Sequence, residues 1–381
     1  MNKKVLVLYQ DWDGWFLNKE GYEKFEHWFK YKDGAYDKSN HYYILSLGRE
    51  NSVLKLEENI EVEIVKSSPI RQLIDLFKFK KRVAEVVEDF EPDYIYVPFL
   101  YLASSLPKGV NKRYKVIGFL RDITPEMIKA KGGIRRIGAY LFYFLDYLAM
   151  KKVDILLYNS PHLKDYALKM GFSKKLVFAP RDVADKEYFS SPIVEDLKEK
   201  LLKEYNLKDK KIILTVARLT PEKNIEMGIK AMKYLPEDFL YLVVGEGFYR
   251  NHLEGLVKKY GVEDRVLFLG YIPHRYIWSV YKLADIFWLL SRTNFEGIPN
   301  VILEAWYSKV PVVVSNIPAF KCLVRDRETG VVLSKLDERE LAEKTMEILK
   351  DEELYSKLIK GGYKEMKRIT SQHIKVKELF K

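Results

Sequence analysis

The stretch Glu296-Gly-Ile-Pro-Asn-Val-Ile-Leu-Glu304 places a Gly-x-Pro-Asn turn between two carboxylates. Proline suits the first turn of a helix, where its missing N–H costs nothing. The pattern therefore predicts a helix over Asn300–Ser308, with Glu304 inside it and Glu296 on the loop before it. Amide groups at a helix start form a ready anion site. We interpret the stretch as a site for a phosphate-bearing ligand whose hydroxyl groups meet the two carboxylates. The alternative is a loop and helix start with two solvated glutamates.

The composition of the chain indicates a multidomain globular protein and excludes several other classes of protein. The chain has 381 residues, nearly half of them apolar, which suits two or three domains. Its single cysteine, Cys322, excludes a disulfide framework and a multi-cysteine metal site, and we expect it to be a small buried residue. We expect no signal peptide, and no apolar run has the ~18 residues that a membrane span needs. The net charge of +11 favours anionic partners.

Short apolar runs alternate with helical patterns along the first half of the chain. Such alternation indicates βαβ units and a parallel sheet that is buried on both faces. The predicted strands are Lys4–Tyr9, Tyr42–Leu47, Val62–Val65, Tyr94–Pro98, Lys115–Leu120, Ile155–Tyr158 and Lys175–Pro180. The predicted helices are Ile70–Asp89, Ile134–Lys152 and Pro161–Met170.

A second strand–helix series follows a charged stretch. Its predicted strands are Lys211–Ala217, Phe239–Val244, Arg265–Leu269, Ile286–Leu290 and Val310–Ser315. Its predicted helices are Ile193–Tyr205, Glu222–Tyr234, Tyr249–Tyr260, Arg275–Leu283, Asn300–Ser308, Leu336–Lys350 and Asp351–Arg368. The chain is therefore predicted to be an α/β protein with two doubly wound sheets. Ligands of such sheets bind beyond the carboxyl ends of the strands.

Two further corners of the second series carry chemistry at that edge. Arg218 follows the first strand and Lys223 enters the next helix, so two cations can neutralise a diphosphate there. The turn Gly245-Glu246-Gly247 follows the second strand and permits a close backbone approach. Each corner alone also fits an ordinary solvated turn. Together with the Glu296–Glu304 stretch they fall on one edge of one predicted sheet.

With these residues in place, the second half resembles the nucleotide-sugar domain of retaining glycosyltransferases of the GT-B fold, family 4 (glycosyl transferases group 1). The motifs that carry the resemblance are Ala217-Arg-Leu-Thr-Pro-Glu-Lys223, Gly245-Glu-Gly247, Glu296–Ala305 and Pro311-Val-Val-Val314. It implies two Rossmann-like domains facing an interdomain cleft. Residues 1–185 would bind the acceptor, residues 186–365 would bind the nucleotide sugar, and residues 366–381 would cross back to the first domain.

The resemblance also implies roles for individual residues. Arg218 and Lys223 would hold the donor diphosphate, Glu304 the ribose and Glu296 the transferred sugar. Backbone amides near Asn300 and Val301 would face phosphate. The remaining donor-site residues are expected in the glycine corner, beside the nucleobase and on the loop before the helix: Gly245, Glu246, Gly247, Tyr271, Ile272, Gly297, Ile298 and Pro299.

The first half fits the family less well. Its opening loop has only Gly14 where the family often has a Gly-Gly pair. Arg121-Asp122 stands where a His-Asp pair is usual, so no histidine is expected there and Asp122 is taken as a catalytic, acceptor-side residue. Asn159-Ser160 matches the family's Asn-Ser.

The resemblance implies a retaining transfer of sugar to a hydroxyl acceptor. The nucleotide sugar is a co-substrate, so neither a cofactor nor a metal is expected. Fixed cations and a helix start would stabilise the charge that builds on the diphosphate. The expected acceptor is a glycan or a lipid-linked glycan. No nucleic-acid partner is expected, because no motif of interleaved basic and aromatic residues stands out.

The stretch Lys129–Leu145 mixes cations with aromatic and aliphatic residues. Such a helix can lie at an anionic membrane surface, which predicts a cytoplasmic enzyme that is peripheral on the inner face of the membrane. The alternative is a buried helix of the first sheet with a basic N-terminal end. Two other functions also compete with a glycosyltransferase: a nucleotide-sugar epimerase on the same fold, and a non-enzymatic basic protein that binds polyanions.

Overall fold

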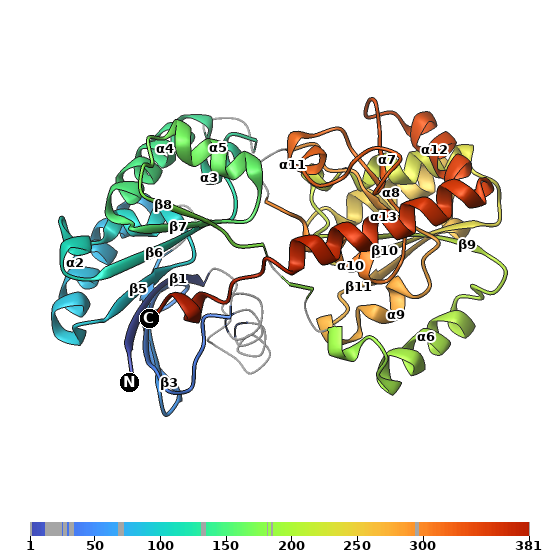
Figure 1. Cartoon of the computed structure of the whole chain (residues 1–381). Coiled ribbons are helices and arrows are strands. Elements are labelled where there is room, and N and C mark those ends of the chain that lie inside the picture. The colour runs from blue at the N-terminus through green and yellow to red at the C-terminus, as the bar shows by residue number, and fades with distance from the viewer. Residues whose placement is uncertain are drawn as a thin grey trace. The chain divides into compact units, whose positions relative to one another are not determined.

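The computed structural model describes residues 2–11, 25, 29, 34–67, 72–130, 135–180, 182–183, 186–293 and 297–380. The chain divides into two compact units (Figure 1). The first comprises Met1–Arg181, Phe295–Gly297 and Gln372–Lys381, and the second comprises Asp182–Asn294 and Ile298–Ser371. Each unit is built around its own sheet. The fold is therefore α/β with two Rossmann-like units, as predicted.

The sheet of the first unit has the strand order β3-β4-β2-β1-β5-β6-β7-β8. All neighbouring strands run parallel except β3 and β4, which are antiparallel. The strands are β1 Lys4–Asp11, β2 His41–Gly48, β3 Ser52–Glu57, β4 Ile60–Lys66, β5 Tyr94–Val97, β6 Lys115–Leu120, β7 Ile155–Tyr158 and β8 Lys175–Phe178. The sequence did not predict β3, because this edge strand buries little: Val53 is 77% exposed.

Residues such as Phe25, Phe29, Val376 and Phe380 pack into a core on one face of this sheet, and helices cover the other face and form a second core. The helices are α2 Gln72–Phe90, α3 Thr124–Ala130, α4 Arg135–Lys152 and α5 Pro161–Lys169, with 3-10 turns at Leu100–Ser105 and Val110–Lys112. The start of α5 follows from its sequence, because Pro161 fits a first helical turn that follows an extended Ser160. The short helix α3 was not predicted.

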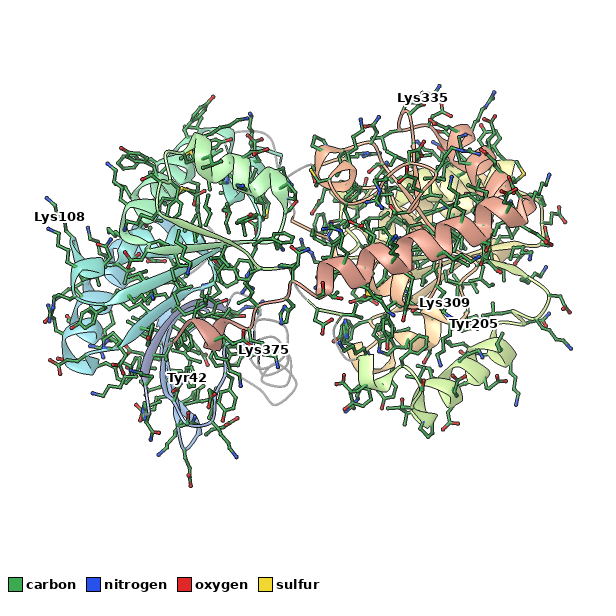
Figure 2. All side chains as sticks on the ribbon, in the orientation of Figure 1. Tyr42, Lys108, Tyr205, Lys309, Lys335 and Lys375 are labelled. Atoms are coloured by element: carbon green, nitrogen blue, oxygen red, sulfur yellow. The ribbon has the colours of Figure 1, made fainter. Side chains whose placement is uncertain are left out.

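Residues 372–380 complete the core of the first unit. Val376 and Phe380 are buried there, and the Phe380 ring lies 5.2 Å from the ring of Tyr94 on β5. Beside them, the amide of Lys377 donates to the carbonyl oxygen of Gly34 at 3.0 Å. Figure 2 labels Lys375 on this segment. The last residues of the chain therefore belong structurally with the first strands.

The sheet of the second unit is entirely parallel, with the order β11-β10-β9-β12-β13-β14. Its strands are β9 Lys211–Val216, β10 Phe239–Val244, β11 Val266–Gly270, β12 Ile286–Leu289, β13 Val312–Val314 and β14 Val331–Val332. Its helices are α6 Pro192–Glu204, α7 Ile225–Ala231, α8 Arg250–Tyr260, α9 Trp278–Tyr281, α10 Asn300–Tyr307, α11 Pro318–Lys321, α12 Glu338–Lys350 and α13 Glu352–Thr370. The two closing helices begin at N-caps, where Asp337 and Asp351 accept backbone amides.

A buried hydrogen-bond chain joins the central strands of this sheet. The hydroxyl of Tyr241 on β10 donates to Thr215 on β9 at 2.8 Å, and the Thr215 hydroxyl donates to the carbonyl of Trp288 on β12 at 2.9 Å. Helix α7 approaches this chain so closely that a Cβ at Gly228 would lie 2.7 Å from the Tyr241 ring. The strands whose ends carry the candidate site are thus held together by polar bonds as well as by packing.

Three local predictions were wrong in detail. Cys322 is exposed, because it lies at the C-terminal end of the four-residue helix α11 on the surface. The predicted helix Glu222–Tyr234 is interrupted, because Asn224 adopts a left-handed conformation (φ 53°) between a 3-10 turn and α7. Pro299 is the N-cap of α10 (φ −70°, ψ 118°), one residue before the first turn.

Among the helices that the structure describes, none has both the length and the apolarity to cross a membrane.

A buried acid lies on α4 in the first unit. Asp146 is 2% exposed and accepts a hydrogen bond from the Tyr166 hydroxyl at 2.7 Å. Burial raises the pKa of Asp146 to about 7; the Tyr166 bond opposes this shift and the charge of Asp122 adds to it. The folded protein therefore binds a proton at Asp146 that the unfolded chain, with a pKa of 3.8, releases.

We expect Asp146→Asn to remove a pH dependence of stability. The stabilisation from protonated Asp146 is fully present below about pH 4 and is lost as the pH rises through about 7, because the raised pKa belongs to the folded state. The variant keeps an oxygen for Tyr166 to donate to. Urea unfolding at pH 5 and pH 8 should show the variant gaining on the wild type by a few kcal/mol at the higher pH, at about 1.4 kcal/mol per pKa unit.

The control is Asp165→Asn on the exposed face of α5, which should leave the pH dependence unchanged. An Asp146→Asn variant whose stability follows the wild-type pH profile would contradict the assignment.

Candidate functional site

The candidate site is built where the parallel strands of the second sheet end. The corner after β9 carries Arg218, which is exposed and forms no ion pair with any residue that the structure describes. Lys223 ends the 3-10 turn Pro221–Lys223 and is half-buried. The two predicted cations therefore lie on one corner, five residues apart, at the carboxyl end of a central strand.

The corner after β10 lies directly against the corner after β9. The amide of Leu219 donates to the carbonyl of Glu246 at 3.0 Å, and the amide of Tyr249 donates to the carbonyl of Leu219 at 3.1 Å. A Cβ at Gly247 would lie 2.2 Å from the Leu219 oxygen, and one at Gly245 (φ 131°) 2.0 Å from the Ala217 oxygen. Both glycines are therefore required by the neighbouring backbone.

The corner after β11 joins the same edge. The amide of Gly245 donates to the carbonyl of Gly270 at 2.8 Å. Glu246 forms an ion pair with Arg250 at 2.7 Å on the first turn of α8. Tyr271 follows Gly270 and is half exposed, and Ile272 continues the same loop. Three successive strand ends thus form one continuous backbone surface that includes the predicted nucleobase segment.

Helix α10 supplies the amide groups predicted for phosphate. Asn300 and Val301 are its first two residues, and the N-cap residue, Pro299, provides no side-chain cap. The first-turn amides of a helix have no intrahelical acceptor and attract anions. Ile298 and Pro299 lead into the helix within the second unit, whereas Gly297 is grouped with the first unit, where its amide donates to the Arg121 carbonyl at 3.0 Å.

Glu304 on α10 is 3% exposed and is held by two side chains. His274 Nε2 lies 3.0 Å from Oε1, and the Tyr281 hydroxyl donates to Oε2 at 3.0 Å. Burial, and then the Glu304 charge, raise the pKa of Tyr281 well above its usual value, so the phenol stays protonated and donates. Neither partner was predicted, because each lies more than twenty residues before Glu304 in the sequence.

A second ion pair, also absent from the prediction, braces the β9 and β12 corners. Arg292, just beyond β12, contacts Glu226 of α7 at 2.8 Å, and its amide donates to the carbonyl of Glu222 at 2.9 Å. Burial pushes the pKa of Glu226 upward, but the Tyr249 hydrogen bond and the Arg292 charge bring it below its usual value. Glu226 therefore stays ionised and fixes the position of α7.

Buried hydroxyl groups lie at the same edge without a hydrogen-bond partner in the described part of the chain. They are Ser291 Oγ just beyond β12 and Thr220 Oγ1 just beyond β9. Buried polar groups are nearly always hydrogen-bonded, and exceptions call for an explanation. A polar ligand at this edge supplies one.

The remaining predicted residues lie elsewhere. Glu296 and Gly14 fall outside the described residues. Asp122 lies in the first unit, just after β6, where it accepts a hydrogen bond from the Thr124 hydroxyl at 2.9 Å. The structure thus brings Arg218, Lys223 and Glu304 to the corners and covering helix of one unit, and places Asp122 in the other.

Solved structures that resemble this chain over nearly its whole length have the GT-B fold. The chain resembles Anabaena Alr3699/HepE, crystallised in complex with UDP (TM-score 0.70, 18% identity, 97% of this chain and 98% of the other). It also resembles WaaG, a glycosyltransferase involved in lipopolysaccharide biosynthesis (TM-score 0.70, 15% identity, 99% and 98% covered). The protein therefore has the GT-B fold.

Residues 197–365, which lie in the second unit, match the family model of glycosyl transferases group 1. An N-acetylgalactosaminyltransferase of Campylobacter jejuni that acts on a diphospho-undecaprenol is 26% identical over 82% of this chain and 85% of its own length. An alpha-D-kanosaminyltransferase of Streptomyces kanamyceticus is 30% identical over 46% of each chain. Several of the relatives, the Streptomyces kanamyceticus enzyme among them, align with this chain over less than half of their own length.

We expect Gly245→Ala and Gly247→Ala each to destabilise the second unit by roughly 2 kcal/mol or more, because the added Cβ would overlap a backbone oxygen of the β9 corner. The measurement is urea unfolding followed by circular dichroism.

Gly255→Ala, in the middle of α8, is the matched control. A Cβ there meets nothing within 4 Å, so alanine should be neutral or stabilising by up to about 1 kcal/mol. Equal stabilities for all three variants would contradict the close packing of the two corners.

Proposed function

We propose that the protein is a glycosyltransferase that moves a sugar from a nucleotide-sugar donor to a hydroxyl acceptor, with retention of configuration and without a metal ion. One observation supports this most strongly. In a unit that matches the family model of glycosyl transferases group 1, two cations, a glycine corner and a helix start without a side-chain N-cap occupy one edge of a single parallel sheet.

The donor diphosphate binds at the β9 corner in this proposal. Arg218 is exposed there and engages no described carboxylate, so its guanidinium is available for forked hydrogen bonds to phosphate. Lys223 adds a second positive charge on the same corner. The amides of Asn300 and Val301 complete the anion site from the start of α10. The unsatisfied hydroxyl of Ser291 offers one more donor at the same edge.

The rest of the donor lies along the neighbouring corners. Glu304 accepts hydrogen bonds from the ribose, and the segment Tyr271-Ile272 lies against the nucleobase, next to the corner that Gly245, Glu246 and Gly247 form. Glu296 is proposed to bind the transferred sugar, by resemblance to the family alone, because it falls outside the described residues.

The chemistry then follows from electrostatics. Negative charge builds on the diphosphate oxygen as the glycosidic bond breaks, and preorganised cations and amides stabilise that charge in the transition state. We infer that the acceptor hydroxyl attacks from the face that the diphosphate leaves, which retains the configuration. Asp122 in the first unit is proposed to act on the acceptor side.

The acceptor is proposed to be a lipid-linked glycan. Several relatives bear names that specify undecaprenol-linked acceptors. They include the Campylobacter jejuni enzyme described above and a galactosyltransferase of Escherichia coli acting on GlcNAc-diphosphoundecaprenol (34% identity over 43% of this chain and 42% of its own). Such an acceptor lies in a membrane, so a surface of the protein should contact lipid.

Helix α4 offers that surface. One face packs into the first core, with Ala139, Asp146 and Ala149 all buried. The opposite face exposes five large apolar side chains at helical spacing: Ile137 (71%), Tyr140 (74%), Leu141 (40%), Phe144 (53%) and Tyr147 (39%). The helix is thus buried on one side only, and its exposed apolar side supports the proposal of a lipid-facing surface.

The charges near this face favour an anionic membrane as its partner. Lys151 packs its ammonium 4.2 Å from the Tyr147 ring, and Lys129 on α3 is exposed. Aromatic side chains beside cations suit the headgroup region of a bilayer. We therefore propose that the enzyme is cytoplasmic and peripheral, with the exposed face of α4 on the inner surface of the membrane.

We expect Arg218→Ala and Lys223→Ala each to lower the transfer rate by roughly a hundredfold, because each removes a fixed charge that stabilises the leaving diphosphate. A thermal-shift screen with nucleoside diphosphates and nucleotide sugars first identifies the donor, since only ligands of the native state stabilise it. Transfer is then measured with that donor in the presence of EDTA.

Lys258→Ala on the exposed face of α8 is the control and should keep the wild-type rate. Unchanged rates in the Arg218 and Lys223 variants would exclude this corner as the diphosphate site. NMR of the product reports the anomer: an inverted anomer would refute retention, and an altered nucleotide sugar formed without acceptor would indicate an epimerase instead.

We expect the triple variant Ile137→Ser, Tyr140→Ser, Phe144→Ser to float with anionic liposomes at least tenfold less than the wild type at low salt, because it removes the most exposed apolar side chains of α4. The measurement is flotation with vesicles of phosphatidylglycerol and phosphatidylcholine.

Val53→Ser, which removes an equally exposed apolar side chain from the edge strand β3, should float like the wild type. A wild-type protein that stays with the soluble fraction at low salt would defeat the membrane proposal.

A further inference from the structure

His274 contacts a residue of the proposed donor site but has no role of its own in the function proposed above. It opens the 3-10 turn His274–Tyr276, immediately after the loop that carries Tyr271 and Ile272. Its Nε2 lies 3.0 Å from Oε1 of Glu304. The histidine therefore connects the loop proposed for the nucleobase to the carboxylate proposed for the ribose.

The two partners of Glu304 differ in their environment. Tyr281 is fully buried, and its hydroxyl also lies 3.3 Å from the carbonyl oxygen of Val301 on α10. The side chain of His274 is 25% exposed, whereas that of Glu304 is 3% exposed. The solvent side of the carboxylate is therefore the side that His274 occupies. The edge of its ring faces Trp278, with ring centroids 6.5 Å apart and ring planes at 87°, which limits how the imidazole can turn.

The hydrogen-bond capacity of Glu304 sets what a ligand can find there. An ionised carboxylate accepts about four hydrogen bonds. The Tyr281 hydroxyl donates to Oε2 and His274 Nε2 lies at hydrogen-bond distance from Oε1, so the two oxygens are held by different side chains. Two oxygens fixed by separate donors match two adjacent hydroxyl groups on one sugar ring. Loss of the His274 donor removes one restraint on rotation of the carboxylate about its terminal bond, and such torsions are soft.

We propose that His274 is a positioning residue, which orients the Glu304 carboxylate to accept the two ribose hydroxyls of the nucleotide and so selects ribonucleotides over deoxyribonucleotides. This inference rests on the proposed function. It requires the tautomer of His274 that carries hydrogen on Nε2, because a bare Nε2 would face a carboxylate oxygen. The buried Tyr281 holds Oε2 of the carboxylate, and the partly exposed His274 holds Oε1 and so sets the orientation of the group.

The experiment measures binding of UDP, GDP, ADP and CDP, and of their 2′-deoxy counterparts, to the full-length protein by calorimetry. For the diphosphate that binds best, the wild type should prefer the ribose form roughly tenfold, the value of one good hydrogen bond. His274→Leu removes the donor. It should weaken binding of the ribose form about tenfold and of the deoxy form, which keeps only the 3′-hydroxyl, clearly less, so that most of the preference is lost.

His274→Gln is the matched variant, because its amide N–H can still donate to Glu304. It should keep most of the preference, which a purely structural role of the ring would not explain. Its binding also provides the test if His274→Leu proves unfolded by circular dichroism: loss of the preference in a folded His274→Gln would then overturn the proposal.

The outcomes separate this inference from the function on which it rests. A wild type that binds none of the eight diphosphates overturns the proposed function, and the role of His274 falls with it. A wild type that binds with a ribose preference, together with a His274→Leu variant that keeps the same preference or weakens both forms equally, overturns only the role of His274.

Discussion

The second unit depends on the backbone contact between the corners after β9 and β10. Carbonyl oxygens of Ala217 and Leu219 occupy the space that side chains at Gly245 and Gly247 would need. The same segments exchange amide hydrogen bonds, and the amide of Gly245 extends them to β11. Arg218 lies within this contact, so its Cα is fixed by the backbone on both sides, while its side chain is exposed and pairs with no carboxylate in the described part of the chain. Rigidity and accessibility are thereby combined at one residue.

Glu304 illustrates how a buried charge can serve a site. A carboxylate with 3% exposure needs compensation, and here two neutral or cationic donors provide it from different turns. The ion pair between Arg292 and Glu226 plays a comparable part on the other side of β9. Both arrangements hold an acidic side chain in place through hydrogen bonds from separate parts of the chain. The cations of the β9 corner, Arg218 and Lys223, can then interact with an anion that binds at this edge of the sheet.

Much of the fold could be predicted because apolar runs flanked by polar turns determine both sheets, and every predicted strand is present within one or two residues. Strand β3 was missed because its side chains are half exposed, and the exposure of Cys322 was missed because a lone cysteine has no pattern. The positions of Arg218, Lys223 and Glu304 followed from motifs at strand ends. Their partners could not be predicted, because His274, Tyr281 and Arg292 meet the site through tertiary contacts that leave no periodicity in the sequence.

The return of residues 372–380 to the first unit has a consequence for biosynthesis. Val376 and Phe380 fill the core beside β5, yet the ribosome adds them after the whole second unit. Part of the apolar interior of the first sheet therefore stays uncovered while the second unit is translated. The first unit can consequently complete its core only after residues 372–380 have left the exit tunnel, so the unit made second can finish folding before the unit made first.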